Sequence, residues 1–388
     1  MSEQSTTSPM AHQKVAIIGA GISGLVLGRC LLNRGIPAIL YEKNSKSQFG
    51  KRHNYGISLN ASSIRPLLQI LDIDEASFKR KIAVDSSIGG TGCISTTNGS
   101  EKAFRANRNK FERLLCDGLD VRWEHAFDKC DSNNHSPDFK LKVHFDNSHM
   151  EESTLLVGAE GPHSTVRKAI APATDFEILP YVVINGKRRV DSSTFDSRYA
   201  AKLNEANVIE QRIGNVLLQI SINDRTGTEV SISYTYSRPA RQSSDPVFKP
   251  SRPKSGATEI PQELFDEVNA LKDLPEPFND VFDDEKMKKD RLLNWLMRTV
   301  LAPKELLQDA AKTGVTLVGD AAHHEPILGS EGANEAIEDA MALADCMASE
   351  DANSLRVYAE NRYETWASYV KEGKDRLESM HGAMSAHL

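Results

Sequence analysis

The sequence has few cysteines and no long hydrophobic run. Its five cysteines are scattered through 388 residues, and no two of them form a Cys-x-x-Cys pair. This spacing gives no sign of a zinc site or a disulfide framework, so we expect reduced thiols, no bound metal and a cytoplasmic location. No apolar stretch approaches the length of a membrane span, and residues 1–13 lack the apolar centre of a signal peptide.

The sequence also has fewer basic than acidic residues. The chain has 54 acidic and 47 basic residues, which gives a net charge of −7. A net negative charge disfavours nucleic acid and anionic membranes as main partners. Hydrophobic content of 39% and charged content of 26% are typical of a soluble globular protein. The length allows two domains, or one large domain with another inserted into it.

The strongest pattern lies in residues 15–43. An apolar run, Val15–Ile18, leads into a glycine triplet that opens a helical pattern, and a second apolar run follows. This order predicts a strand, a turn, a helix and a strand that together bind a dinucleotide. In such a unit Gly19 makes the tight turn, Gly21 lets the backbone approach a pyrophosphate, and Gly24 lets the helix pack closely on the strand.

An acidic residue, Glu42, ends the second strand of this unit. A carboxylate at this distance from the glycines is placed to accept hydrogen bonds from the ribose hydroxyls of an adenosine. The free N–H groups of the helix N-terminus attract the phosphates. A dinucleotide is therefore expected, but this unit alone does not distinguish NAD from FAD.

The pattern changes after residue 176. The segments Tyr181–Ile184, Val216–Ile222 and Val230–Tyr236 alternate or are rich in β-branched residues, as in an antiparallel sheet. A buried parallel strand is predicted within 314–320. Helices are predicted at Asp290–Leu296 and at Leu355–His381.

This order predicts an α/β fold with a discontinuous Rossmann-type domain, an inserted antiparallel-sheet substrate domain and a C-terminal helix. We expect the nucleotide-binding domain to comprise 14–75, 100–175 and 288–350, the substrate domain 76–99 and 176–287, and the C-terminal helix 351–388.

Four further segments resemble one enzyme family. Leu155–Arg167 resembles the "DG" motif of single-component (group A) flavin monooxygenases, the family of para-hydroxybenzoate and salicylate hydroxylases. Val315–His323 is similar to the family's "GD" motif, and Pro326–Asp339 is similar to the loop and helix that follow it. Arg108 matches the family arginine that supports the flavin pyrophosphate. The resemblance covers nearly the whole chain, and it is strongest to compact members from fungal secondary metabolism.

The resemblance implies FAD as the bound cofactor and NADPH or NADH as the electron donor. It places Asp320 at the ribityl chain and Arg52 where a basic residue steers the flavin. Backbone N–H groups around Gly332 would stabilise negative charge on the flavin pyrimidine. The nicotinamide cleft would contain Glu160 and Gly161. The implied FAD-binding residues are Gly19, Gly21, Ser23, Gly24, Glu42, Lys43, Arg52, Arg108, Gly319, Asp320, Gly329, Gly332, Ala333 and Asn334.

The implied reaction inserts oxygen into a small molecule. The nicotinamide reduces FAD, O2 adds to the reduced flavin, and a C4a-hydroperoxyflavin hydroxylates or epoxidises an aromatic or apolar secondary metabolite. Tyr234 and Tyr236 share one face of a predicted strand, where they would contact either the substrate or the sheet core. The expected substrate residues are Tyr234, Tyr236, His324, Pro326 and Ile327. No general base is evident.

Three departures from the family pattern leave alternatives open. Glu160 replaces the aspartate of the "DG" motif, and Gly329-Ser330 replaces Gly-Gly or Gly-Gln. Ile327 occupies the position of a proline that faces the reactive flavin carbon, and Pro326 stands one place earlier. FAD binding tolerates these changes, whereas oxygen insertion is more sensitive to them. The alternatives are an FAD-dependent dehydrogenase, reductase or oxidative cyclase, and a non-enzymatic flavoprotein. A halogenase is disfavoured because the Trp-x-Trp-x-Ile-Pro signature is absent.

Overall fold

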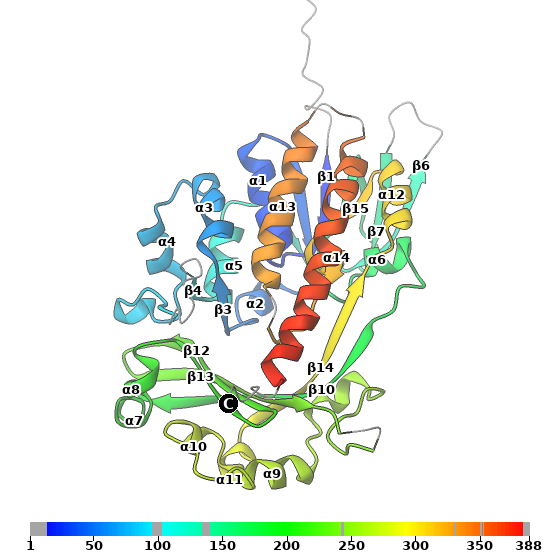
Figure 1. Cartoon of the computed structure of the whole chain (residues 1–388). Coiled ribbons are helices and arrows are strands. Elements are labelled where there is room, and N and C mark those ends of the chain that lie inside the picture. Colours follow the sequence, from blue (N-terminus) through cyan, green and yellow to red (C-terminus); the bar gives the residue numbers. More distant parts are fainter. Residues whose placement is uncertain are drawn as a thin grey trace, which may run out of the picture.

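A computed structural model describes residues 14–94, 103–133, 140–241, 244–329, 331–349, 351 and 353–382. Figure 1 shows an α/β part above a separate, strongly twisted sheet. The C-terminal helix α14 (Ser354–His381) runs from the first part to the second. The predicted α/β class, the inserted antiparallel sheet and the final helix are therefore confirmed.

The α/β part is built on a five-stranded sheet in the order β15-β9-β1-β2-β5, in which every pairing is parallel. All four residues of β1 are buried, as expected for a strand in the middle of a covered sheet. Helix α1 (Ile22–Asn33) packs against α13 (Gly332–Ala348). The strands are β1 Val15–Ile18, β2 Ala38–Glu42, β5 Val121–Trp123, β9 Leu155–Gly158 and β15 Val315–Leu317.

Shorter elements complete this part. Helix α4 (Glu75–Ile82) buries Phe78 and Ile82 in the same core as β1, so the start of the predicted 76–99 segment packs with the nucleotide-binding part. The other elements are α2 Lys46–Phe49, β3 Gly56–Leu59, α3 Ala61–Ile70, η2 Ser86–Ile88, β4 Phe104–Asn107, α5 Arg108–Cys116, β6 Phe127–Asn133, β7 Lys140–Phe145, β8 Met150–Ser153, α6 Thr165–Ile170, α12 Lys304–Lys312 and η4 Gly319–Ala321.

The second sheet has six antiparallel strands in the order β11-β12-β13-β10-β14-β16. The helix predicted at Asp290–Leu296 is wrong, because Arg291–Leu301 forms strand β14 with a largely alternating burial pattern. The segment from 288 to 301 thus belongs with this sheet rather than with the nucleotide-binding part. The strands are β10 Glu177–Asp191, β11 Val208–Ile213, β12 Val216–Arg225, β13 Glu229–Pro239, β14 Arg291–Leu301 and β16 His323–His324.

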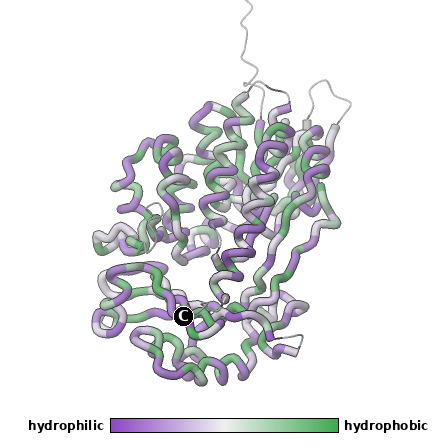
Figure 2. The backbone as a smooth tube through the Cα atoms, viewed as in Figure 1, coloured by the Kyte–Doolittle hydropathy of each residue, from purple (hydrophilic) through white to green (hydrophobic). Residues whose placement is uncertain are grey.

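The two faces of this sheet have different neighbours. One face packs on helices below it in Figure 1, and the other face, at Val183 and Leu217, meets Leu328 and Leu377 of α14. Figure 2 shows that much of α14 is hydrophilic, in line with the charged helix that the sequence predicts. The helices are α7 Ser192–Arg198, α8 Ala200–Leu203, η3 Lys254–Thr258, α9 Gln262–Asn269, α10 Phe278–Val281 and α11 Asp284–Met287.

The cysteines and the helices agree with the compositional expectations. All five cysteines lie in described segments and none forms a disulfide. Nowhere in the described segments does a helix combine the length and the apolar character needed to span a bilayer.

Candidate functional site

The three glycines of the β1–α1 turn have different surroundings. A Cβ atom on Gly19 would lie 2.6 Å from the carbonyl oxygen of Ala159, and one on Gly24 would lie 2.1 Å from the oxygen of Gly19. Gly19 also has a φ of +105°, which favours glycine. A Cβ on Gly21 would meet no protein atom closer than 4.0 Å. Packing therefore explains the first and third glycines, whereas Gly21 leaves open space beside the backbone that a cofactor would need.

Two helices begin without a side-chain cap at this edge of the sheet. Helix α1 follows Gly21 with no acidic residue in its first turn, and α13 starts at Gly332. The first N–H groups of a helix have no partner within the helix, and together they attract anions. Ser23 of α1 lies beside Gly319 of the "GD" motif, where a Cβ would be 3.1 Å from the Ser23 Cβ. Both helix ends are thus suited to the negatively charged parts of a flavin dinucleotide.

The acid at the end of β2 lies beside the glycine turn. Glu42 is buried, and its Oε2 accepts a hydrogen bond from the Ala20 N–H at 3.1 Å. Its Oε1 accepts from the Asn44 side chain at 2.7 Å and lies 3.0 Å from Arg52 Nη1. Arg52 also donates to the Ala20 carbonyl at 2.6 Å, while Lys43 is exposed. The structure thus brings two of the predicted site residues, Glu42 and Arg52, together at the turn.

Arg108 is the first residue of α5 and contacts a glutamate that was not predicted from the sequence to belong to the site. Glu112 is fully buried and contacts Arg108 at 2.8 Å, His53 at 3.1 Å and Arg52 at 3.6 Å. Burial alone would raise the pKa of Glu112, but these three groups outweigh it and lower the pKa to about 2. Glu112 therefore holds the cations of two predicted site segments in place. The i,i+4 spacing from Arg108 was the available signal.

Asp320, the aspartate of the "GD" motif, is partly exposed and lies next to this charged cluster. Burial would raise the pKa of Asp320, but His324, His323 and Arg108 lower it, so the carboxylate is ionised. His324 is buried and its Nδ1 lies 3.2 Å from Asp320. Arg167 of the "DG" motif is also buried and donates to the Ala321 carbonyl at 2.9 Å. Arg167 thus joins the two motifs through the backbone, and no carboxylate partner is needed.

The residues that open α13 divide into two roles. Asn334 accepts a hydrogen bond from the Asn60 N–H at 2.9 Å and donates to the Ser58 carbonyl at 3.3 Å, so its side chain ties α13 to β3. Gly332 and Ala333 are the first two residues of the helix and contribute their N–H groups. Gly329 has a φ of +81°, and its carbonyl accepts from Arg376 at 2.7 Å.

Glu160, predicted to lie in the nicotinamide cleft, caps a helix in the structure. Its carboxylate accepts from the N–H of Val166 at 3.0 Å, the N–H of Thr165 at 3.1 Å and the hydroxyl of Ser164 at 2.6 Å. It therefore caps the N-terminus of α6, where a carboxylate is favoured. Gly161 has a φ of +78°, with open space on its side-chain side.

The placement of Tyr234 and Tyr236 at the substrate is wrong. Both side chains are buried in the core that the sheet forms with α9 and α10. In Figure 1 these helices lie on the side of the sheet that is away from the α/β part. Tyr234 donates to Asp290 at 2.7 Å and Tyr236 donates to Glu267 at 2.7 Å. The alternation of the strand was predicted correctly, but alternation does not tell which face is which.

The loop after Asp320 presents one apolar side chain to solvent. Ile327 is 51% exposed, one of few large hydrophobic residues that are exposed in the described chain, whereas Pro326 is buried. Pro326 packs toward Gly373 of α14, where a Cβ would lie 3.1 Å from the proline ring. Ile327 is therefore available to a ligand, and Pro326 is not.

A group of three cations and one histidine near Phe176 was not predicted from the sequence. Arg298 lies over the Phe176 ring, 5.5 Å from its centroid, and His163 meets the same ring at 5.3 Å. Partial burial and nearby positive charges, including Lys254 and Arg298, lower the pKa of His163 to about 4. Burial and Arg298 also lower the pKa of Arg252. Within the described segments none of these four basic residues pairs with a carboxylate, so the cluster would be stabilised by an anion.

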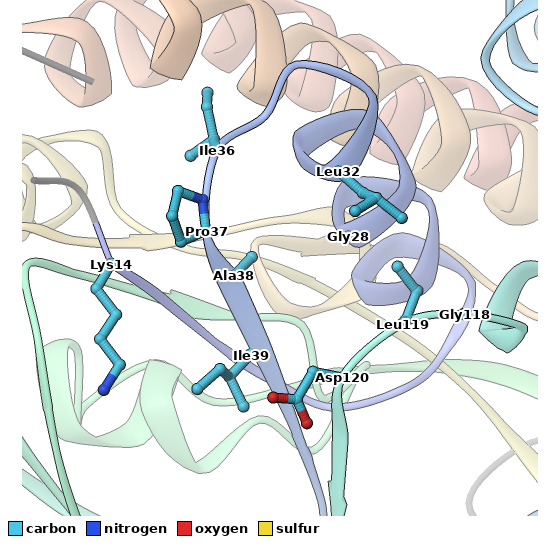
Figure 3. Close-up of a pocket in the computed structure, with 10 residues that line it drawn as sticks. All are labelled: Lys14, Gly28, Leu32, Ile36, Pro37, Ala38, Ile39, Gly118, Leu119 and Asp120. Atoms are coloured by element: carbon cyan, nitrogen blue, oxygen red, sulfur yellow. The ribbon is translucent and has the colours of Figure 1, made fainter. Parts of the chain in front are cut away.

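A surface cavity of about 520 Å³ lies elsewhere, at the amino ends of β1 and β2 (Figure 3). Ligands of parallel α/β sheets bind beyond the carboxyl ends of the strands, which is the opposite edge. We therefore assign no function to this cavity. It is lined by Lys14, Gly28, Leu32, Ile36, Pro37, Ala38, Ile39, Gly118, Leu119 and Asp120.

Comparisons with known proteins indicate the family of the chain. Residues 284–371 match a family model described as an FAD binding domain. The chain is 32% identical to the FAD-dependent monooxygenase nscC of Neosartorya fischeri, over 96% of each chain.

Solved structures support the same fold. Klebsiella pneumoniae HpxO, crystallised with FAD and uric acid, superposes with a TM-score of 0.66 at 16% identity, covering 96% of this chain and 90% of HpxO. The 2,6-dihydroxypyridine-3-hydroxylase of Arthrobacter nicotinovorans gives a TM-score of 0.69 at 14% identity, covering 97% and 95%.

Proposed function

Because the chain belongs to the family of FAD-dependent monooxygenases, we propose that it uses NADPH or NADH and O2 to hydroxylate or epoxidise a small aromatic or apolar secondary metabolite. Bound FAD supplies the electron transfer and the activation of oxygen, while the protein binds, orients and excludes water. The observation that carries this proposal is the open side of Gly21 between two uncapped helices, beside Arg108 and Asp320.

Different residues at this edge would bind different parts of the cofactor. The N-terminus of α1 would hold the pyrophosphate, Glu42 the adenosine ribose and Asp320 the ribityl hydroxyls. The first N–H groups of α13 would balance negative charge on the flavin pyrimidine when the ring is reduced. Arg52 already contacts Glu42, so its side chain is placed to move when the ribose binds.

We place the phosphates of the nicotinamide donor at the cation cluster of Arg298, Lys254 and Arg252, beside the neutral imidazole of His163. Its unpaired positive charges support this choice, and Glu160 is occupied by capping α6. A dianionic phosphate would relieve the repulsion among these groups.

Substrate would lie between the flavin edge and the upper face of the six-stranded sheet, next to Ile327. A second candidate is oxidation without oxygen insertion, as in a dehydrogenase or oxidative cyclase. The isoleucine at the family's proline position is the specific feature that favours it.

The test has three parts. The purified protein should carry about one FAD per chain, and NADPH or NADH should reduce it without air. Aromatic compounds should then be screened for stimulation of NAD(P)H oxidation, and products formed under ¹⁸O₂ should gain one labelled atom. A product without label, with hydrogen peroxide as the sole oxygen product, would move the assignment to the second candidate.

A further inference from the structure

Two glutamates are buried together behind the loop that carries Ile327. Glu325 is 3% exposed and Glu335 is 4% exposed, and their carboxyl groups lie within hydrogen-bonding distance of each other. His323 is the third member of the cluster, with one ligand atom of each residue within 4.8 Å of the others. In the described chain, Glu325 Oε1 and His323 Nδ1 are buried with no hydrogen-bond partner. Most buried polar atoms have a hydrogen-bond partner, so an unpaired carboxylate oxygen at this position indicates a proton donor or an ion beside it.

The charges around the cluster leave one carboxylate uncompensated. Arg376 of α14 lies 3.1 Å from Glu325 Oε2. Asp339 is already paired with Arg362, and His323 Nε2 lies 2.7 Å from it. Among the described residues Arg376 is the only cation that acts on Glu335, and Glu335 forms no ion pair of its own. The charged and titratable groups that act on the pair are Arg376 of α14, His323 of β16, Asp320 of η4 and Asp339 of α13.

We propose that Glu325 and Glu335 share one proton at neutral pH, and that this acid–carboxylate pair positions the flavin loop against α13. The hydroxyl of un-ionised Glu335 would donate to Glu325 Oε1 and satisfy that oxygen. Burial and the neighbouring Glu325 both raise the pKa of Glu335. Two adjacent carboxyls in a low-dielectric site cannot both be charged without a large penalty.

A divalent metal ion is the competing occupant, since one histidine and two carboxylates form a possible ligand set. The position of Arg376 favours the proton, because its guanidinium, 3.1 Å from Glu325 Oε2, already neutralises Glu325.

The pair matters because of where its members lie. Glu335 is in the first turn of α13, directly after Asn334, and Arg376 holds both Glu325 and the Gly329 carbonyl. An ionised Glu335 would weaken the positive end of the helix and repel Glu325 from behind the loop. This consequence for the flavin depends on the proposed function, but the shared proton does not.

The test compares Glu335→Gln with wild type by urea unfolding at several pH values between about 6 and 9. The folded chain keeps a proton that the unfolded chain releases above its ordinary carboxyl pKa. The folding constant of wild type should therefore fall about tenfold per pH unit relative to the variant, about 1.4 kcal/mol. Asp345→Asn, at an exposed position of the same helix, is the control and should give a profile parallel to wild type.

A second measurement does not depend on the variant folding. Infrared spectra of wild type labelled with ¹³C-glutamate should show the carbonyl band of an un-ionised carboxylic acid at pH about 8. Parallel unfolding profiles, absence of this band, or one equivalent of transition metal retained through purification and lost in Glu335→Gln would each overturn the proposal. No flavin turnover enters either measurement, so failure of the proposed function would leave both results unchanged.

Discussion

The two sheets of this protein present their functional residues in different ways. In the parallel sheet, the residues that suit FAD follow the strand ends, so Gly21, Glu42 and Asp320 meet at one edge. In the antiparallel sheet, function depends on which face a side chain occupies. Tyr234 and Tyr236 occupy the face that packs on helices, while the opposite face looks toward the flavin edge. Sequence position determines the first arrangement, and only the tertiary fold determines the second.

The largest effect should come from filling the open side of Gly21. We expect Gly21→Val to weaken FAD binding about 1,000-fold, about 4 kcal/mol, because the added side chain would occupy the path of the pyrophosphate. Gly227 of the antiparallel part also has open surroundings, so Gly227→Val is the matched control. Equilibrium dialysis of FAD measures both. Equal affinities would mean that Gly21 is no cofactor contact.

Acid pH should destabilise the charged edge of the parallel sheet through Glu112. Its folded pKa lies below the unfolded value, so its stabilisation is present above the unfolded carboxyl pKa and is lost as pH falls toward about 2. We expect wild type to lose up to about 3 kcal/mol of unfolding free energy in this window. In Glu112→Gln this component should be absent, whereas Glu263→Gln, at an exposed site on α9, should keep it.

The two faces of the antiparallel sheet should separate stability from activity. Tyr234→Phe removes one of the donors to Asp290, which keeps its hydrogen bonds from Arg188, and should cost about 2 kcal/mol of unfolding free energy, with kcat/KM unchanged. Ile327→Ala removes an exposed side chain and should change stability by less than about 0.5 kcal/mol while raising the KM for substrate. A change in the KM for substrate in Tyr234→Phe would instead mean that this tyrosine contacts the substrate.

The smallest predicted effect concerns the cation cluster. Arg298→Met should raise the KM for NADPH about tenfold, about 1.4 kcal/mol, because a charge-assisted phosphate contact is lost. FAD affinity should not change. Arg189→Met, on the same sheet with a side chain 76% exposed, serves as the control. Steady-state kinetics would count against the cluster if the two variants behaved alike.

Sequence patterns predicted the parallel-sheet half of the site because strand, turn and helix are local. The open surroundings of Gly21, the position of Glu42 beside the turn and the proximity of Arg108 to Asp320 all agree with that prediction. The missed cluster around Phe176 depends on contacts between distant segments, since Arg298 and His163 meet at that ring. Strand β14 was mistaken for a helix because its apolar residues fit both periods.

The buried pair Glu325–Glu335 shows the same limit. These residues are ten positions apart along the chain, and only the return of α14 brings Arg376 onto Glu325, while Glu335 forms no ion pair in the described segments. No periodicity in the sequence signals this arrangement.

The most direct test of the central claim is a crystal structure of the FAD complex. We expect the pyrophosphate against Gly21 and the N-terminus of α1, and the flavin pyrimidine against the N–H groups of Gly332 and Ala333. The isoalloxazine should then face Ile327 and the upper face of the antiparallel sheet. FAD bound with its pyrophosphate away from Gly21, or with its ring away from α13, would contradict the account.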